Sequence, residues 1–205
     1  MSELKICSDF CDFYDKLSTK GSLVTYKRYL SECKQRGVAL QYLRNLGVKT
    51  IEIRQVSKYI PIDGDLVVYT DPMLHNGNGK RIMSVIDAQR SYNNYVASIY
   101  IRSTDPLTVK YLQIGKRRFN LYYRKRQELT LDAGDLVDIR EIPSDYNRLI
   151  ALPIYSIDYI QYNNEMLATD FNEVQNLHNI GFERFMTAEQ IINEIRDSIL
   201  IYNKA

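Results

Sequence analysis

The feature that most constrains the fold is a change of periodicity near residue 49. Before it, apolar residues recur at loosely helical spacing among charged ones, and Gly37 and Gly47 would divide and end two helices. After it come short runs rich in Val, Ile, Tyr and Thr, separated by turn residues, which is typical of hairpin-linked strands. We expect strands at 50–54, 65–70, 82–86, 96–101, 108–114, 119–123, 149–160 and 166–171.

The C-terminal part returns to a helical pattern. Thr187 and Gln190 stand at the N-cap and N3 positions of a capping box, and Met186 and Ile191 are placed as a hydrophobic staple. The apolar residues expected on one face of this helix are Ile191, Ile192, Ile195, Ile199 and Tyr202. Helices at both ends of a run of strands predict an α+β fold with mainly antiparallel sheets. We divide it into a helical segment, 1–48, and one compact domain, 49–205.

The composition excludes several classes of protein. The chain has 205 residues, of which 45% are hydrophobic, and its 27 basic and 25 acidic residues give a net charge of +2. These values are typical of a globular protein rather than of a disordered chain or a strongly basic nucleic-acid carrier. Three cysteines make a poor disulfide framework, so we expect reduced thiols and a cytoplasmic location. The sequence has neither an apolar signal-peptide core nor an apolar run of about 20 residues, so we expect no membrane partner.

Two acids in neighbouring strands form the first candidate site. Side chains of a strand alternate between faces, and a three-residue loop over 163–165 would place Asp158 directly opposite Asp170, with Asn172 on the same face. A two-residue Asn-Asn turn would put the two acids on opposite faces. Carboxylates directly opposite each other repel unless a cation lies between them, and Mg²⁺ is such a cation. The alternative is that both acids are ordinary surface residues at strand ends.

A glycine-rich loop, 75–80, forms the second candidate site. Gly77 and Gly79 would let backbone N–H groups approach phosphates closely, and Lys80 would add a positive charge. The alternative is an ordinary hairpin turn, for which Asn-Gly is a common signal.

The third candidate is the basic segment 116–126, in which six cations surround three aromatic residues. Charge and stacking together could bind RNA or single-stranded DNA. However, the strand period would split these cations between two faces, and the chain as a whole is nearly neutral. The alternative is a solvated edge strand.

The order of these elements resembles the ATP-grasp superfamily over roughly residues 44–182. In that family a strand, a glycine-rich phosphate loop and a second strand precede a hinge strand that binds adenine. A hairpin bearing Arg or Lys and two metal-binding strands follow. The most specific element is the spacing of Asp158, Asp170 and Asn172, which matches an Asp followed about a dozen residues later by acid-x-Asn.

The resemblance implies ATP and Mg²⁺ as cofactors and a site made of three groups of residues. The Mg²⁺ ligands would be Asp158, Asp170 and Asn172. The ATP contacts would come from the loop and the hinge, namely Gly77, Gly79, Lys80, Ile99 and Ile101. The cations facing phosphate or acyl phosphate would be Lys110 and Arg124.

The activity implied by the resemblance is ATP-dependent ligation of a small-molecule or peptide carboxylate to an amine, or a related phosphoryl transfer. The chain departs from the family at three points. Tyr69 and Thr70 stand where the family usually has a lysine, and Asp170 stands where it usually has Glu. Only the helical segment of about 48 residues precedes the predicted domain 49–205, where family members usually carry a separate α/β domain. The alternative is therefore a non-catalytic interaction module that keeps the fold and contacts nucleic acid through residues 116–126.

Overall fold

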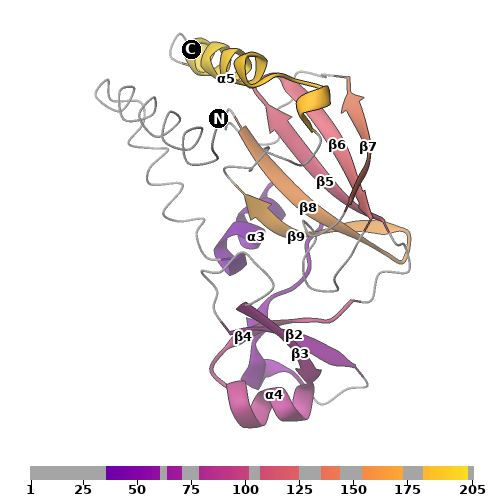
Figure 1. Cartoon of the computed structure of the whole chain (residues 1–205). Coiled ribbons are helices and arrows are strands. Elements are labelled where there is room, and N and C mark those ends of the chain that lie inside the picture. Colours follow the sequence, from indigo (N-terminus) through magenta and orange to yellow (C-terminus); the bar gives the residue numbers. More distant parts are fainter. Residues whose placement is uncertain are drawn as a thin grey trace.

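The computed structural model describes residues 36–60, 64–70, 79–101, 107–124, 135–143, 154–172 and 182–202. Two antiparallel sheets lie one above the other in Figure 1, with helices α3, α4 and α5 around them. The strand orders are β1-β4-β2-β3 in the first sheet and β7-β6-β5-β8-β9 in the second. The α+β prediction is therefore confirmed.

The first sheet packs one face against helix α4 (Val85–Tyr92). Its strands are β1 (Arg54–Gln55), β4 (Val96–Ile99), β2 (Asp65–Tyr69) and β3 (Lys80–Ser84). Leu66, Val68 and Ala97 point toward α4 and are fully buried. Because side chains alternate along a strand, Tyr69 and Ser98 lie on the opposite face, which we call the inner face.

Two predictions for this region were wrong. Residues 82–86 do not form one strand, because β3 ends at Ser84 and α4 begins at once. The Ser84 hydroxyl accepts a hydrogen bond from the Asp87 N–H at 3.1 Å, which is an N-cap that the spacing Ser-x-x-Asp could have revealed. The alternating run 50–54 is not a five-residue strand either. Thr50 forms a single parallel bridge with Ala168, and the ladder begins only at Arg54.

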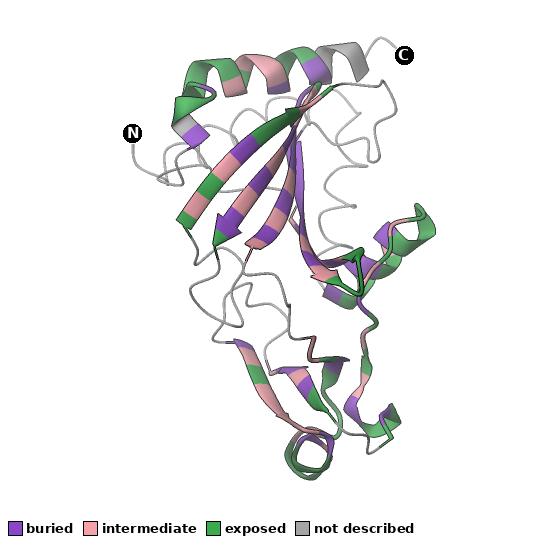
Figure 2. Ribbon diagram, turned by 90° about the vertical axis from the view of Figure 1, so that its right-hand side faces the viewer, coloured by how far each residue is buried: buried purple, intermediate pink, exposed green. Residues whose placement is uncertain are grey.

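The second sheet carries the candidate acids. Its strands are β7 (Asp135–Ile142), β6 (Arg117–Arg124), β5 (Leu107–Ile114), β8 (Ile154–Tyr162) and β9 (Glu165–Asn172). Strand β7 was not predicted, since its four charged residues obscure the apolar alternation. Figure 2 shows burial alternating along the strands, as expected when the two faces of a sheet differ. We call the face that carries Leu112, Leu121 and Asp158 the front face.

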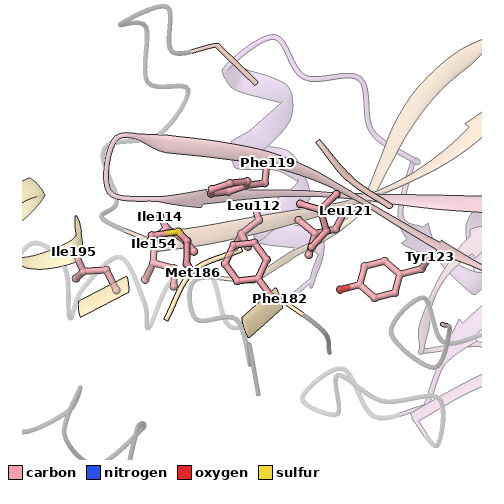
Figure 3. Packing of buried hydrophobic residues seen from close by; sticks show 10 residues of the cluster. Leu112, Ile114, Phe119, Leu121, Tyr123, Ile154, Phe182, Met186 and Ile195 are labelled. Atoms are coloured by element: carbon pink, nitrogen blue, oxygen red, sulfur yellow. The ribbon is translucent and has the colours of Figure 1, made fainter. Parts of the chain in front are cut away.

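Helix α5 (Ala188–Tyr202) and the short 3-10 helix Phe182–Arg184 cover one end of the front face. Figure 3 shows Phe182 and Met186 beside Leu112, and the Phe182 and Phe119 rings meet edge to face at 5.1 Å. The predicted capping box is confirmed. The Gln190 N–H donates to Thr187 Oγ1 at 3.2 Å, and the Thr187 N–H donates to Gln190 Oε1 at 2.8 Å. The predicted apolar face was too wide, since Ile192 is 51% exposed.

Helix α3 (Arg36–Asn45) covers the back face beside β9. Its buried residues Ala39, Leu40 and Leu43 belong to the same core cluster as Tyr155 and Phe171. The helix ends as predicted at Gly47, which adopts φ +84° while the Val48 N–H donates to the Leu43 carbonyl at 3.0 Å. Gly37 lies within α3 as its second described residue, and the helix predicted before it lies outside the described residues.

Candidate functional site

The turn between β8 and β9 differs from the predicted one. Asn163 and Asn164 form a two-residue loop with φ values of 50° and 63°, and Tyr162 pairs with Glu165. Asparagine tolerates the left-handed region that both central positions of such a turn require. The three-residue loop was therefore a wrong prediction. In a regular ladder this turn would place Asp158 and Asp170 on opposite faces.

A β-bulge at Thr169 restores the predicted pairing of the acids. Tyr159 pairs with Ala168, but the next pair along the ladder is Asp158 with Asp170, so Thr169 is one extra residue. The Thr169 hydroxyl donates to the Asp158 carbonyl oxygen at 3.2 Å. Ser156 pairs with Asn172, so Asp158, Asp170 and Asn172 all lie on the front face, as predicted.

Lys110 meets Asp158 on this face. It is the β5 residue paired with Asp158, and its Nζ lies 3.2 Å from Asp158 Oδ1. The two side chains are only 3% and 6% exposed. A buried lysine needs a compensating charge, and Asp158 provides it. The structure thus brings together two residues for which we predicted different roles: Lys110 as a cation facing phosphate, and Asp158 as a metal ligand.

Arg36 is a site residue that the sequence did not indicate. It is the first described residue of α3, passes the edge of β9 and places Nη2 2.8 Å from Asp170 Oδ2 and Nη1 2.8 Å from the Thr169 carbonyl oxygen. The Phe171 N–H donates to Asp170 Oδ1 at 3.0 Å. An arginine in a half-apolar helix gives the pattern of a solvated residue, so no sequence signal identifies this contact.

Arg36 also contacts the first sheet. Its guanidinium lies 5.2 Å from the ring centroid of Tyr69, and the Tyr69 hydroxyl is 3.1 Å from Ser98 Oγ. Burial raises the pKa of Tyr69 above its ordinary value. Burial is the largest single influence on Arg36 and lowers its pKa, but Asp170, Tyr69 and Asp158 together outweigh it, so the pKa of Arg36 is raised. Arg36 therefore links the inner face of the first sheet to the front face of the second.

We call Arg36, Lys110, Asp158 and Asp170 the charge cluster. Its two cations and two carboxylates cancel, and each side chain is at most 9% exposed. Buried charges persist in proteins only when they are paired, and they are common at functional sites. The cluster lies where residues of both sheets meet.

The chemical type of the available donor atoms fits the predicted magnesium site. Asp158, Asp170 and Asn172 offer oxygen ligands from two adjacent strands on one face, which suits a hard cation. Both carboxylates are, however, already engaged by Lys110 and Arg36. Within the part of the chain that the structure describes, no group of three or more His, Cys, Asp or Glu residues could hold a metal ion.

A cavity of about 380 Å³ lies beside the predicted hinge. Ile99 and Ile101 line it, as do Tyr162 and Leu167 of the β8–β9 hairpin. Leu167 pairs with Ile160, two residues beyond Asp158 on β8, so this wall lies on the same face as the charge cluster. The remaining lining residues are Thr50, Ile51, Glu52, Arg54, Lys58, Tyr59 and Ile60.

The other predicted residues are placed as follows. Lys80 pairs with Tyr69 and so lies on the inner face of the first sheet. The Gly79 carbonyl accepts from the Thr70 N–H at 2.9 Å, and Gly77 lies outside the described residues. Arg124 is exposed at the end of β6, and alternation places it on the back face, away from Lys110.

The basic segment is divided between faces, as its strand period predicts. Arg117 forms a two-bond ion pair with Glu141 at 2.7 and 2.8 Å, and its guanidinium lies over the Phe119 ring. Arg118 and Tyr122 occupy the opposite face of β6. Residues 125 and 126 lie outside the described part.

Comparison with solved structures identifies the architecture. The chain is similar to a D-alanine–D-alanine ligase from Bacillus anthracis complexed with ATP, with a TM-score of 0.55 and 13% identity. It is also similar to the ADP complex of an N5-carboxyaminoimidazole ribonucleotide synthetase, with a TM-score of 0.56 and 13% identity. The fold is ATP-grasp-like.

The similarity covers much of this chain but less of the other proteins. It includes 84% of this chain and 66% of the B. anthracis ligase, and 82% against 52% for the synthetase. A D-alanine–D-alanine ligase from Helicobacter pylori gives a TM-score of 0.54 at 13% identity, over 80% of this chain and 60% of the ligase. The chain thus spans between about half and two thirds of the length of these structures. No protein-family model and no curated protein sequence matches it.

The described helices are too short or too polar to cross a membrane.

Proposed function

We propose that the protein binds ATP between its two sheets and uses it to join a carboxylate to an amine. The observation that carries the proposal is the buried charge cluster, which an ATP-grasp-like fold assembles where the two sheets meet. Two proteins of similar fold are described as complexes with ATP and ADP. Buried, paired charges where two structural layers meet are a frequent property of functional sites.

The parts of the nucleotide are assigned by the chemistry of the walls. The cavity lined by Ile99, Ile101 and Leu167 would take the base, because it is largely apolar and adjoins the hinge. The phosphates would lie toward Arg36, Lys80 and Lys110, which supply positive charge from both sheets.

The residues of the site can orient and neutralise the reacting groups. In the proposed reaction the substrate carboxylate attacks the terminal phosphorus of ATP and displaces ADP. An amine then attacks the carbonyl carbon of the acyl phosphate, loses a proton and displaces phosphate. Positioning and charge neutralisation carry most of such a transfer, and Lys110 and Arg36 are placed for both. Asp158, Asp170 and Asn172 would hold Mg²⁺, which when bound offsets phosphate charge.

A second candidate is a nucleotide-binding or interaction module without turnover. The observation that favours it is Tyr69, which is buried on the inner face where a family lysine was expected. A tyrosine at that position carries no positive charge toward phosphate. The two candidates differ in one measurable property, the release of ADP and phosphate.

Thermal unfolding of the full chain with ATP or ADP, each with and without Mg²⁺, tests nucleotide binding. A nucleotide at 100 times its dissociation constant should stabilise the protein by about 2.7 kcal/mol, or roughly 5–10 °C in Tm. Lys80→Gln should reduce this shift, whereas the matched charge loss Arg196→Gln on α5 should not. Absence of any shift in the wild-type protein would refute the proposal.

Turnover is tested separately. ADP release that depends on both a carboxylate and an amine supports the ligase. Nucleotide binding without such release, over a broad panel of acids and amines, supports the module instead.

A further inference from the structure

Without a ligand, the positive and negative charges of the charge cluster cancel one another. Both carboxylates of the expected metal set are engaged by buried cations from elsewhere in the chain. Lys110 comes from the central strand β5, and Arg36 comes from a helix on the other side of the sheet. A divalent cation arriving alone would therefore meet two acids whose charge is already cancelled.

The burial of the cluster makes that cancellation matter. Interactions between charges are much stronger in a buried site than in water, and unbalanced charge there is costly. A metal ion added to the closed cluster would leave two excess positive charges among side chains that are 3–9% exposed. Moving Arg36 aside would in addition break its bond to the Thr169 carbonyl and its contact with Tyr69.

Nucleotide phosphates change this balance. They bring negative charge to Arg36 and Lys110, and the guanidinium and ammonium groups bind phosphate oxygens well. Each cation that turns to phosphate releases one carboxylate. Lys80 on the inner face lies beside Tyr69, the ring that Arg36 covers, so a third cation is close to the same place.

We propose that Arg36 and Lys110 keep Asp158 and Asp170 closed to a divalent metal until nucleotide phosphates bind. Metal binding is then conditional on nucleotide, and α3 takes part in the condition through Arg36. The inference rests on the proposed nucleotide site and adds an order of binding to it.

The test uses Mn²⁺ as the probe and water-proton relaxation of the full chain as the readout. We expect weak binding of Mn²⁺ alone, and at least about tenfold tighter binding when ATP is present, with a relaxation enhancement that the Mn²⁺–ATP complex does not show by itself. Asp170→Asn should weaken that enhancement, because it replaces a carboxylate ligand with a neutral amide oxygen. Thermal unfolding with ATP in EDTA reports nucleotide binding independently of metal.

Two arginine variants distinguish the specific effect of Arg36 on Asp170 from the general effect of removing one positive charge. Arg36→Gln frees Asp170, so Mn²⁺ alone should bind at least roughly tenfold tighter than to the wild-type protein. Arg196→Gln removes an equal charge from an exposed pair on α5 and should leave Mn²⁺ binding unchanged. If Arg36→Gln does not fold, the comparison of Mn²⁺ binding to the wild-type protein with and without ATP still tests the inference.

Two outcomes would overturn the inference and leave nucleotide binding standing. They are tight binding of Mn²⁺ alone to the wild-type protein, and a thermal shift with ATP but no ternary Mn²⁺ complex. Absence of any shift with ATP would instead refute the proposed function, and the inference with it.

Discussion

Gly115, in the turn between β5 and β6, allows α5 to approach the sheet closely. It adopts φ +59°, and a Cβ built on it would lie 2.5 Å from the Glu194 carbonyl oxygen and 2.8 Å from the Glu194 carbonyl carbon. Contacts below 3.0 Å with backbone atoms cannot be relieved by a side-chain rotation, so alanine must push α5 away. We therefore expect Gly115→Ala to destabilise the fold through two separate terms.

The magnitude follows from a matched control. The left-handed region costs an L-residue about 1–2 kcal/mol, and forcing extra volume into a packed contact costs about 1–3 kcal/mol more. Gly47 adopts φ +84° but has no atom within 4 Å of its would-be Cβ, so Gly47→Ala carries only the first term. Gly115→Ala should thus lower the free energy of unfolding by roughly 2–5 kcal/mol, and by about 1–3 kcal/mol more than Gly47→Ala.

Urea unfolding of both variants and of the wild-type protein, followed by circular dichroism, gives the comparison. Equal losses in the two variants would show that α5 does not contact the β5–β6 turn as closely as the structure has it. A larger loss for Gly47→Ala would refute the reasoning altogether.

Three further outcomes are expected. Arg36→Met should cost about 3–5 kcal/mol in urea unfolding, because Asp170 stays buried without its cation; a loss below 1 kcal/mol would contradict the buried pair. Ser84→Ala should cost about 1 kcal/mol through the lost N-cap of α4, and unchanged stability would argue against that cap. Burial raises the pKa of Tyr59 and of Tyr159 from 10.0 to about 12, so the stability they confer is complete below pH 10 and lost between pH 10 and 12. Absorbance titration showing phenolate formation only near pH 10 would contradict this.

The acid pair shows how much of the site could be predicted. The hairpin needs one residue beyond a two-residue turn to bring Asp158 opposite Asp170, and the sequence does not reveal where that residue is accommodated. We placed it in the loop, whereas the structure places it at Thr169. Both solutions give the same pairing of the acids, so the shared face was predicted correctly from an incorrect turn. Only the residues between turn and bulge, such as Leu167, change partners.

Other features could not be predicted from the local sequence pattern, because contacts between distant parts of the chain create them. Arg36 joins the site only when α3 docks on the back face, and its nearest partner in the cluster is 134 positions away. Strand β7 forms by pairing with β6, although four of its residues are charged. Helix α4, by contrast, was readable from the cap at Ser84.

The route of Arg36 around β9 has a practical consequence for shortened versions of this protein. A truncation that starts at residue 49 would keep every strand described above, yet it would remove the helix that covers Tyr155 and Phe171 and the Arg36 guanidinium that pairs with Asp170. Such a fragment would expose an apolar patch, and it would also leave the buried Asp170 carboxylate without the Arg36 cation. We expect it to aggregate, and any expression boundary should therefore be drawn ahead of Arg36.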